Sequence, residues 1–290
     1  MRTPTHWRLA ASVAVLAAMT MPAFAEYAEA WRVDTYKMPE SVAVDSANQA
    51  LFVTNINSAD QSSNGEGYIT KANMDGTIAT EKLTDGLNAP RGIAFADGKL
   101  YVGQNGEVLE IDATSGEVLA RHPVENGLFN DVLAAPDGRI FISETMTGSI
   151  YVIDKGEFSQ FLTDPALSGA NGLLIVDGKL LVASIGDLSG GFANIKPGNI
   201  KSVDLETKAI TDFGSAALIG NLDGINALPD GSVLVSDNFS GALTKVNADG
   251  TTELMANSGP GTADQLYLPE QKLVIVPVIQ SNSLIAYTVE

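Results

Sequence analysis

The stretch Asn171-Gly-Leu-Leu-Ile175 places a polar side chain two positions before a short apolar run, and five other stretches share this arrangement. The six polar residues, called the anchors below, are spaced by 51, 39, 41, 52 and 41 residues. The other five open the stretches Glu40-Ser-Val-Ala-Val44, Arg91-Gly-Ile-Ala-Phe95, Asn130-Asp-Val-Leu-Ala134, Asp223-Gly-Ile-Asn-Ala227 and Asp264-Gln-Leu-Tyr-Leu268. A unit of about 40–45 residues with four short strands is typical of a β-propeller blade. We therefore expect the anchors to converge at one end of a central axis.

Each unit continues with the strands that such a blade requires. A second apolar strand is predicted at residues 51–54, 100–103, 140–143, 180–183, 233–236 and 273–276. A third is predicted at residues 68–71, 108–111, 150–153, 200–203, 243–246 and 284–287. Asp-Gly pairs, such as Asp97-Gly98 and Asp177-Gly178, separate the first two strands in four units, and Asp-Gly is a strong hairpin signal because Gly adopts positive φ without steric cost. The sequence predicts an all-β, six-bladed β-propeller.

The two ends of the chain complement each other. The last unit stops after its third strand, at Glu290, and residues 31–36 supply a candidate for the missing fourth strand. We expect these N- and C-terminal strands to pair and close the ring, which would remove exposed sheet edges.

The first 25 residues have the features of a secretory signal peptide. Arg2 and Arg8 precede an apolar run at residues 9–19, and Ala23-Phe-Ala25 offers a small-residue cleavage site. We expect residues 26–290 to form one propeller domain that is exported to the periplasm. No other stretch approaches the roughly 20 apolar residues of a membrane-spanning helix.

The charge and the residue composition exclude several classes of partner and of catalytic or metal site. Beyond residue 25 the chain has 15 basic and 35 acidic residues, a formal net charge of −20, which argues against nucleic acid and anionic membrane surfaces as partners. We expect a monomer that acts on a small molecule. The absence of cysteine excludes disulfides, thiolate zinc sites and cysteine nucleophiles. His122 is the single histidine beyond residue 25, and we expect it on an outer strand, which disfavours a Ser-His-Asp triad.

The chemistry of the anchors favours a cation. Glu40, Asp223 and Asp264 contribute three negative charges, Arg91 contributes one positive charge, and Asn130 and Asn171 add amide oxygens. A ring of such oxygens suits a hard divalent cation, with calcium favoured and zinc or magnesium as alternatives. The competing interpretation is structural: Asn and Asp are common at strand starts because they cap turns.

Two long loops are expected beside this ring. Residues 55–67 and 185–198 are rich in Gly, Ser and Asn and join the second and third strands of their units. Units one and four face each other in a six-membered ring, so the two loops would flank the mouth of a ligand site. The ends of the second strands carry further polar residues, Asn55, Gln104, Glu144 and Asp237. They are candidates for a second layer around the site, but a plain loop or hydrogen-bonding role is preferred for each.

Four segments resemble one known family across nearly the whole chain beyond residue 25. They are Pro39-Glu40-Ser41, Phe129-Asn130-Asp131 followed by Pro136-Asp137-Gly138, Ala170-Asn171-Gly172-Leu173, and Leu222-Asp223-Gly224-Ile225. The pattern is similar to that of the senescence marker protein, gluconolactonase and luciferin-regenerating-enzyme family of six-bladed propellers.

The resemblance implies roles for specific residues. Glu40, Asn171 and Asp223 would be metal ligands, Asn130 would contact metal-bound water or substrate, and the reaction would be hydrolysis of a lactone or related ester. Leu128 stands where members of that family often have an arginine that helps to hold a sugar acid. This departure argues against gluconolactone as the substrate.

The leading hypothesis is a metal-dependent lactone or ester hydrolase. Asp223, or alternatively Asp264, would act as general base, and Arg91 would stabilise an oxyanion or the product carboxylate. A non-catalytic periplasmic binding propeller with a structural cation is the alternative. A lyase ranks third, since its usual base is a histidine and His122 is poorly placed.

Overall fold

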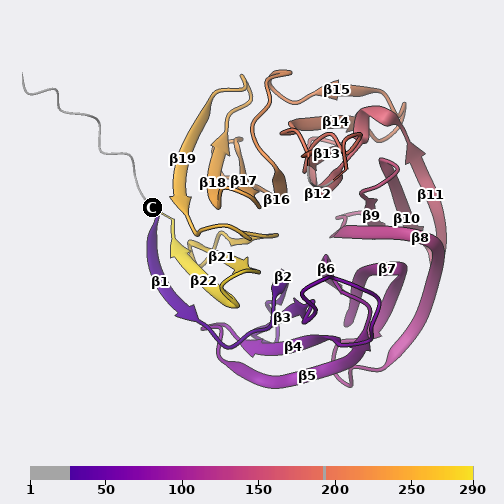
Figure 1. Cartoon of the computed structure of the whole chain (residues 1–290), viewed down its shortest axis with the longest axis vertical. Coiled ribbons are helices and arrows are strands. Elements are labelled where there is room, and N and C mark those ends of the chain that lie inside the picture. Colours follow the sequence, from indigo (N-terminus) through magenta and orange to yellow (C-terminus); the bar gives the residue numbers. More distant parts are fainter. Residues whose placement is uncertain (1–26, 192–193, 290) are drawn as a thin grey trace, which may run out of the picture.

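The computed structural model describes residues 27–191 and 194–289. The predicted signal peptide, residues 1–25, lies outside the described residues. Within them the strands form five antiparallel sheets around a common centre (Figure 1). No helix in this part of the chain has the length and apolar character needed to cross a membrane.

The sheets follow one another along the chain. The first contains β2 (Pro39–Asp45), β3 (Ala50–Asn55), β4 (Gly67–Asn73) and β5 (Ile78–Leu87). The second contains β6 (Ile93–Ala96), β7 (Lys99–Asp112), β8 (Val118–Ala134), β9 (Ile140–Glu144), β10 (Ser149–Asp154) and β11 (Glu157–Thr163), which is followed by the short 3-10 helix η1 (Pro165–Leu167). The third contains β12 (Ala170–Val176), β13 (Lys179–Ser184), β14 (Ile200–Asp204) and β15 (Ile210–Asp212). The fourth contains β16 (Leu222–Ala227), β17 (Val233–Asp237), β18 (Ala242–Val246) and β19 (Thr252–Asn257). The fifth contains β20 (Leu266–Leu268), β21 (Leu273–Val278), β22 (Ser283–Thr288) and β1 (Ala28–Val33).

The prediction of six blades needs correction, because the structure has five sheets in its described part. The predicted second and third units share one six-stranded sheet. Its strand β8 pairs with β7 through its first part and with β9 through its last part, so the ladder runs from one unit into the next without interruption. The sheet is nevertheless folded over: the N–H of Ala113 donates to the carbonyl of Gly98, so the two ends of β7 lie together. Val108, Ile142 and Ile153 are buried in one cluster between its two halves.

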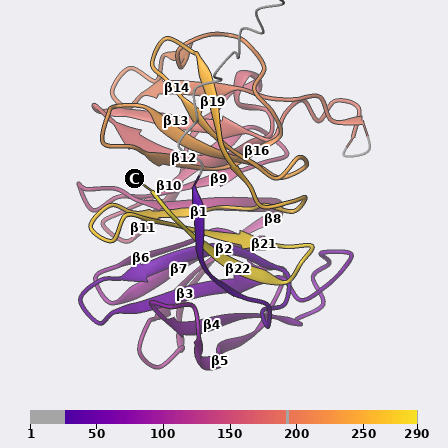
Figure 2. The ribbon, with the colours of Figure 1, turned by 90° about the vertical axis from the view of Figure 1, so that its left-hand side faces the viewer.

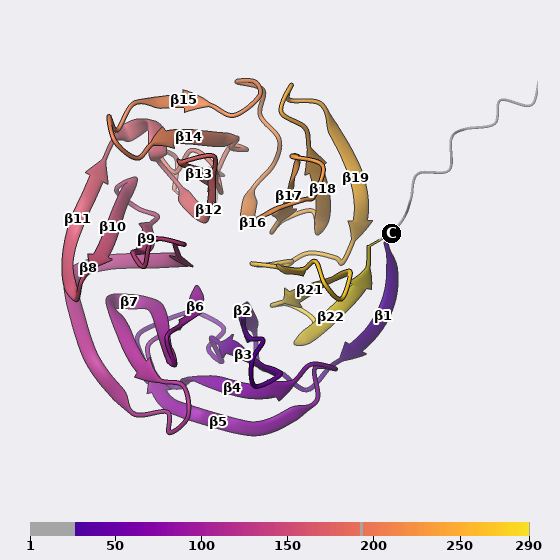
Figure 3. The same ribbon diagram turned by 180° about the vertical axis from the view of Figure 1, so that it is seen from behind.

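The terminal strands lie side by side. β1 pairs antiparallel with β22, from Ala28 opposite Thr288 to Val33 opposite Leu284, and the two are adjacent when the molecule is viewed from behind (Figure 3). The predicted N-terminal strand, residues 31–36, is therefore placed about three residues too late. Viewed edge-on, β1 runs along the outside of the molecule (Figure 2).

The strand pattern itself follows the sequence. All six predicted second strands and all six predicted third strands fall within observed strands. The Asp-Gly turns at 97–98 and 177–178 have positive φ at both residues, as a two-residue hairpin loop of type I′ requires. Asp137-Gly138 differs, because Gly138 alone has positive φ there.

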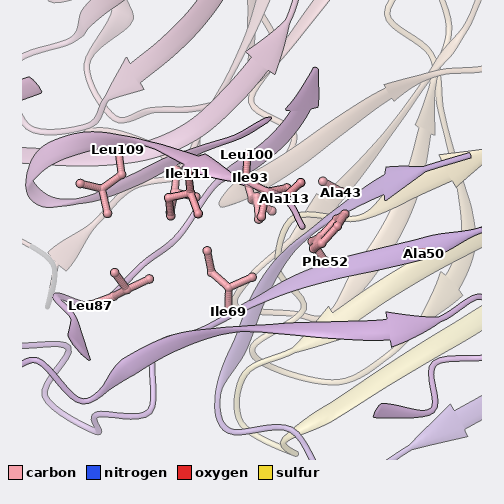
Figure 4. Close-up of a cluster of buried hydrophobic side chains, with 11 residues drawn as sticks. Ala43, Ala50, Phe52, Ile69, Leu87, Ile93, Leu100, Leu109, Ile111 and Ala113 are labelled. Carbon is pink, nitrogen blue, oxygen red and sulfur yellow. The ribbon is translucent and has the colours of Figure 1, made fainter. Parts of the chain in front are cut away.

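The cores lie between neighbouring sheets. Phe52 and Ile69 of the first sheet pack against Leu100, Leu109 and Ile111 of the second (Figure 4). The inner strands contact one another in the order β2, β6, β8, β12, β16 and β20, and β20 contacts β2. Since each anchor lies in an inner strand or two residues before it, this arrangement decides where the anchors lie.

Candidate functional site

Five of the six anchors line one cavity of about 460 Å³. They are between 1% and 8% exposed. They comprise Glu40 in β2, Arg91 two residues before β6, Asn130 in β8, Asn171 in β12 and Asp223 in β16. The structure therefore brings together the three predicted ligands, Glu40, Asn171 and Asp223, with Arg91 and Asn130.

The sixth anchor, Asp264, does not line the cavity. Its carboxylate accepts a hydrogen bond of 2.6 Å from Ser41 Oγ, and its N–H donates to the carbonyl of Glu40. Asp264 thus lies beside Glu40 and is not among the residues that line the cavity. This position disfavours it as an alternative general base, and its charge still acts on Glu40.

Glycines directly after three anchors allow this convergence. A Cβ at Gly92 would lie 2.2 Å from the carbonyl oxygen of Asn130, and a Cβ at Gly172 would lie 2.3 Å from that of Asp223. A Cβ at Gly224 would lie 2.3 Å from Asp264 Oδ1. None of these glycines has positive φ, so their function is close approach of neighbouring inner strands and not a turn.

Replacing Gly172 by alanine is expected to destabilise the protein by about 3 kcal/mol, because the added Cβ meets backbone atoms that cannot rotate away. Chemical denaturation of the variant and the wild type measures the difference. A free energy of unfolding within about 0.5 kcal/mol of the wild type would show that the strands can separate without cost.

Unpartnered oxygens mark the three predicted ligands. Glu40 Oε2, Asn171 Oδ1 and Asp223 Oδ1 are buried and accept no hydrogen bond, and Asn171 Nδ2 also lacks a partner. In the described residues the other such side-chain atoms are Asn226 Oδ1 and Gln265 Oε1. More than nine in ten buried polar groups in proteins are satisfied. The concentration of exceptions on these three side chains indicates that a cation or a polar ligand is needed to complete them.

The pKa values of the cavity carboxylates also indicate that the site needs a positive charge. Burial, followed by repulsion from Asp223 and Asp264, raises the pKa of Glu40 well above its ordinary value. Burial raises the pKa of Asp223 to about 7, against the lowering effects of Asn238 and Asn171. Asn171 is thus close to Asp223, although no hydrogen bond of normal geometry joins them. Such a site becomes fully ionised most readily beside a positive charge.

Arg91 supplies a positive charge but is held to one side. Its Nη1 donates to Asn105 Oδ1 at 2.7 Å and to the carbonyl of Ala89, and its Nη2 donates to Gln61 Oε1 at 3.1 Å. No carboxylate in the described residues lies within ion-pair distance of it. The guanidinium is therefore fixed by neutral oxygens, and it faces the cavity as a group for an anionic or carbonyl oxygen.

Gln61 belongs to the long loop at residues 55–67 and was not predicted. We expect Gln61→Ala to raise KM for an ester substrate about tenfold with a smaller effect on kcat, because it removes one hydrogen bond that orients the Arg91 charge. Steady-state kinetics beside Gln271→Ala, a surface control, checks this. Equal KM values in both variants would mean that Arg91 needs no support from the loop.

The predicted second layer lies one residue away from the cavity wall. Asn55, Gln104, Glu144 and Asp237 do not line the cavity; instead they accept hydrogen bonds from nearby backbone N–H groups. Residues one position further along line it instead: Asn105, within β7, and the residues directly after the other five second strands, Ile56, Thr145, Ile185, Asn238 and Ile279. Successive residues of a strand point to opposite sides of the sheet. A shift of one position therefore exchanges residues that face the cavity for residues that face away from it.

Two members of this wall orient site residues. Asn238 Nδ2 donates to Asp223 Oδ2 at 2.6 Å. Thr145 Oγ1 accepts from Asn130 Nδ2 at 3.3 Å and donates to the carbonyl of Ala170, which leaves the side-chain oxygen Oδ1 of Asn130 for a ligand. His122 lies elsewhere, hydrogen-bonded to Glu110 and stacked on Phe158.

Among the described residues, no group of three or more His, Cys, Asp and Glu side chains could hold a metal ion. The candidate set differs from such a group because it combines two carboxylates with the amide of Asn171. Calcium accepts amide and carboxylate oxygens alike, so the donor types fit a hard cation.

No protein-family model matches the chain, and no curated protein matches it in sequence. Its fold does match solved structures. Regucalcin, a calcium-binding protein from Agrobacterium tumefaciens, has a TM-score of 0.68 at 17% identity, covering 91% of this chain and 95% of that one. A gluconolactonase from Xanthomonas campestris has a TM-score of 0.66 at 16% identity, covering 89% and 88%. Virginiamycin B lyase from Staphylococcus aureus has a TM-score of 0.61 at 14% identity, covering 91% and 99%.

The chain has the β-propeller fold. At these identities the similarity concerns the fold alone. The predicted resemblance to gluconolactonase-like propellers is supported at that level, whereas the number of blades is not.

Proposed function

We propose that the protein is a metal-dependent hydrolase of a lactone or a related small ester. The observation that carries this proposal is the set of three buried oxygens without hydrogen bonds, on Glu40, Asn171 and Asp223, in the floor of one cavity. The likeness of the fold to a gluconolactonase and to a calcium-binding regucalcin supports the reaction class and the type of metal.

Glu40 Oε2, Asn171 Oδ1 and Asp223 Oδ1 are the atoms that would hold the cation, with calcium favoured and magnesium or zinc as alternatives. When bound, the cation would polarise the ester carbonyl and lower the pKa of a water molecule. The two carboxylates supply enough negative charge to attract a divalent ion into a buried site.

The remaining steps belong to side chains of the cavity. Asp223 Oδ2 accepts one hydrogen bond from Asn238, and a carboxylate oxygen has a second acceptor position. This oxygen takes a proton from the attacking water while the water oxygen bonds to the carbonyl carbon. The ring C–O bond then breaks, and the proton passes to the leaving alkoxide oxygen. Arg91 binds the oxyanion and then the product carboxylate, and Asn130 orients the substrate or the water.

A histidine-dependent lyase is not favoured, because no histidine is among the residues that line the cavity. The hydrolase is tested by assaying a panel of lactones after treatment with a chelator and again after adding calcium, magnesium or zinc. We expect turnover to fall on metal removal and to return with one of these ions. Unchanged turnover in metal-stripped protein would overturn the metal dependence, and no turnover on any lactone would overturn the reaction.

The wider organisation follows the same proposal. Residues 26–290 would act as one periplasmic, monomeric domain, exported by residues 1–25. The pairing of β1 with β22 would close the ring and hold the cavity together. The partner would be a small molecule, since the formal net charge of −20 beyond residue 25 disfavours nucleic acid and anionic membranes.

A further inference from the structure

We propose that the substrate is a lactone or ester that carries an apolar substituent, and not a polyhydroxylated sugar lactone; this inference rests on the proposed function. It comes from the distribution of side chains in the wall of the cavity, which differs between its two sides.

One side of the cavity is apolar. Ile185 follows β13, Phe239 lies two residues after β17, Ile279 follows β21 and Ile56 follows β3. These strands belong to the third, fourth, fifth and first sheets, whose inner strands β12, β16, β20 and β2 are successive neighbours. The four side chains therefore form a continuous apolar arc, with Asn238 as its polar member.

The opposite side is mainly polar, with Leu128 of β8 as its apolar member. Arg91, Asn105, Asn130 and Thr145 come from the six-stranded sheet or lie beside it. A hydrogen bond of 2.7 Å joins Arg91 to Asn105, and another of 3.3 Å joins Asn130 to Thr145. A bound ester would direct its carbonyl toward this side and the floor, so its substituent would extend toward the arc.

Phe239 is the member of the arc that remains open to a ligand. It is 48% exposed, and of the large exposed hydrophobic side chains in the described residues it alone lines the cavity. Covering it with an alkyl group removes apolar surface from water, and each buried methylene contributes about a fourfold gain in binding. A sugar hydroxyl packed against Phe239 and the three isoleucines would lose its hydrogen bonds to water and find no partner on those side chains, which costs roughly tenfold or more for each hydroxyl.

Three lactones with the same six-membered ring test the inference: δ-valerolactone with no substituent, δ-nonalactone with a butyl chain, and glucono-δ-lactone with hydroxyl groups. We expect kcat/KM for δ-nonalactone to exceed that for δ-valerolactone at least about tenfold, and glucono-δ-lactone to be the poorest substrate. Phe239→Ala should reduce the ratio of δ-nonalactone to δ-valerolactone about tenfold. Leu254→Ala, which removes another exposed apolar side chain that is not part of the cavity lining, should leave the ratio unchanged.

Equal kcat/KM for the alkyl and bare lactones, or a preference for glucono-δ-lactone, would overturn the inference while leaving the hydrolase intact. Turnover of none of the three would instead count against the proposed reaction. Calorimetric binding of the same compounds then decides the inference: tighter binding of δ-nonalactone that weakens in Phe239→Ala supports it, and equal or undetectable binding overturns it.

Discussion

Replacing Asp223 by asparagine is expected to lower kcat/KM for a lactone by about 10³-fold while the protein stays folded. The substitution keeps the size of the side chain and removes the charge. It replaces one of the two carboxylate oxygens by an amide NH2 group, so the side chain can no longer both hold the cation through Oδ1 and accept a proton at Oδ2. Because the carboxylate is buried and its pKa is raised to about 7, neutralising it does not remove a stabilising ion pair.

The matched control is Asp212→Asn, which changes the charge equally on the outer strand β15, where Asp212 pairs with Lys201. Assays of both variants at saturating metal, together with circular dichroism, separate catalysis from folding. Activity within about threefold of the wild type in Asp223→Asn would exclude Asp223 as the base.

The metal-free protein is expected to be more stable at pH 5 than at pH 8, by roughly 5–10 °C in Tm. Burial raises the pKa of Asp223 to about 7 and that of Asp131 to about 6, and burial with carboxylate repulsion raises the pKa of Glu40. The folded protein therefore binds more protons than the unfolded chain between about pH 4 and pH 7. Stability falls as the pH rises through that window, with a total cost on the order of a few kcal/mol.

Exposed carboxylates do not produce this effect. Asp75, Asp112, Asp204 and Asp249 accept hydrogen bonds within their turns, which lower their pKa values, so they titrate below the window. Thermal unfolding in a chelator at both pH values, and again with calcium, measures the prediction. Calcium should raise Tm more at pH 8 than at pH 5. A chelated protein whose Tm increases from pH 5 to pH 8 would show that the buried carboxylates are stabilised without a cation.

The repeat made the inner part of the site predictable. A polar residue two positions before each inner strand recurs at a near-constant interval, so one register placed Glu40, Arg91, Asn130, Asn171 and Asp223 in one cavity. The same register also predicted Asp264 as part of the ring of anchors, but its carboxylate accepts a hydrogen bond from Ser41 and does not line the cavity. The glycines after the anchors have no local sequence signal for their function, because Gly172 and Gly224 are required by neighbouring strands that are distant in sequence.

The outer part of the site was less accessible to sequence reasoning. Toward the ends of the second strands, the sequence did not show whether Gln104 or Asn105 faces the cavity. Strand periodicity alone does not determine which of two successive residues points inward. Gln61 and Phe239 line the cavity from loops, and no sequence periodicity predicts the conformation of a loop. The joining of two predicted units into one sheet depends on hydrogen bonding through β8, which local strand signals do not report.

The most direct test of the shared cation site is a calorimetric titration of calcium, magnesium and zinc into the chelator-treated protein and into Asn171→Leu. Asn171 is neutral, so this variant removes a proposed ligand without changing the charge of the cavity. Asn199→Leu is the control, because Asn199 is also a buried asparagine but donates to Asp212 outside the cavity. We predict one site per chain for one of these ions in the wild type and in Asn199→Leu, weakened about 100-fold in Asn171→Leu. No binding of any of the three ions, or equal affinity in Asn171→Leu and the wild type, would contradict a cation held jointly by Glu40, Asn171 and Asp223.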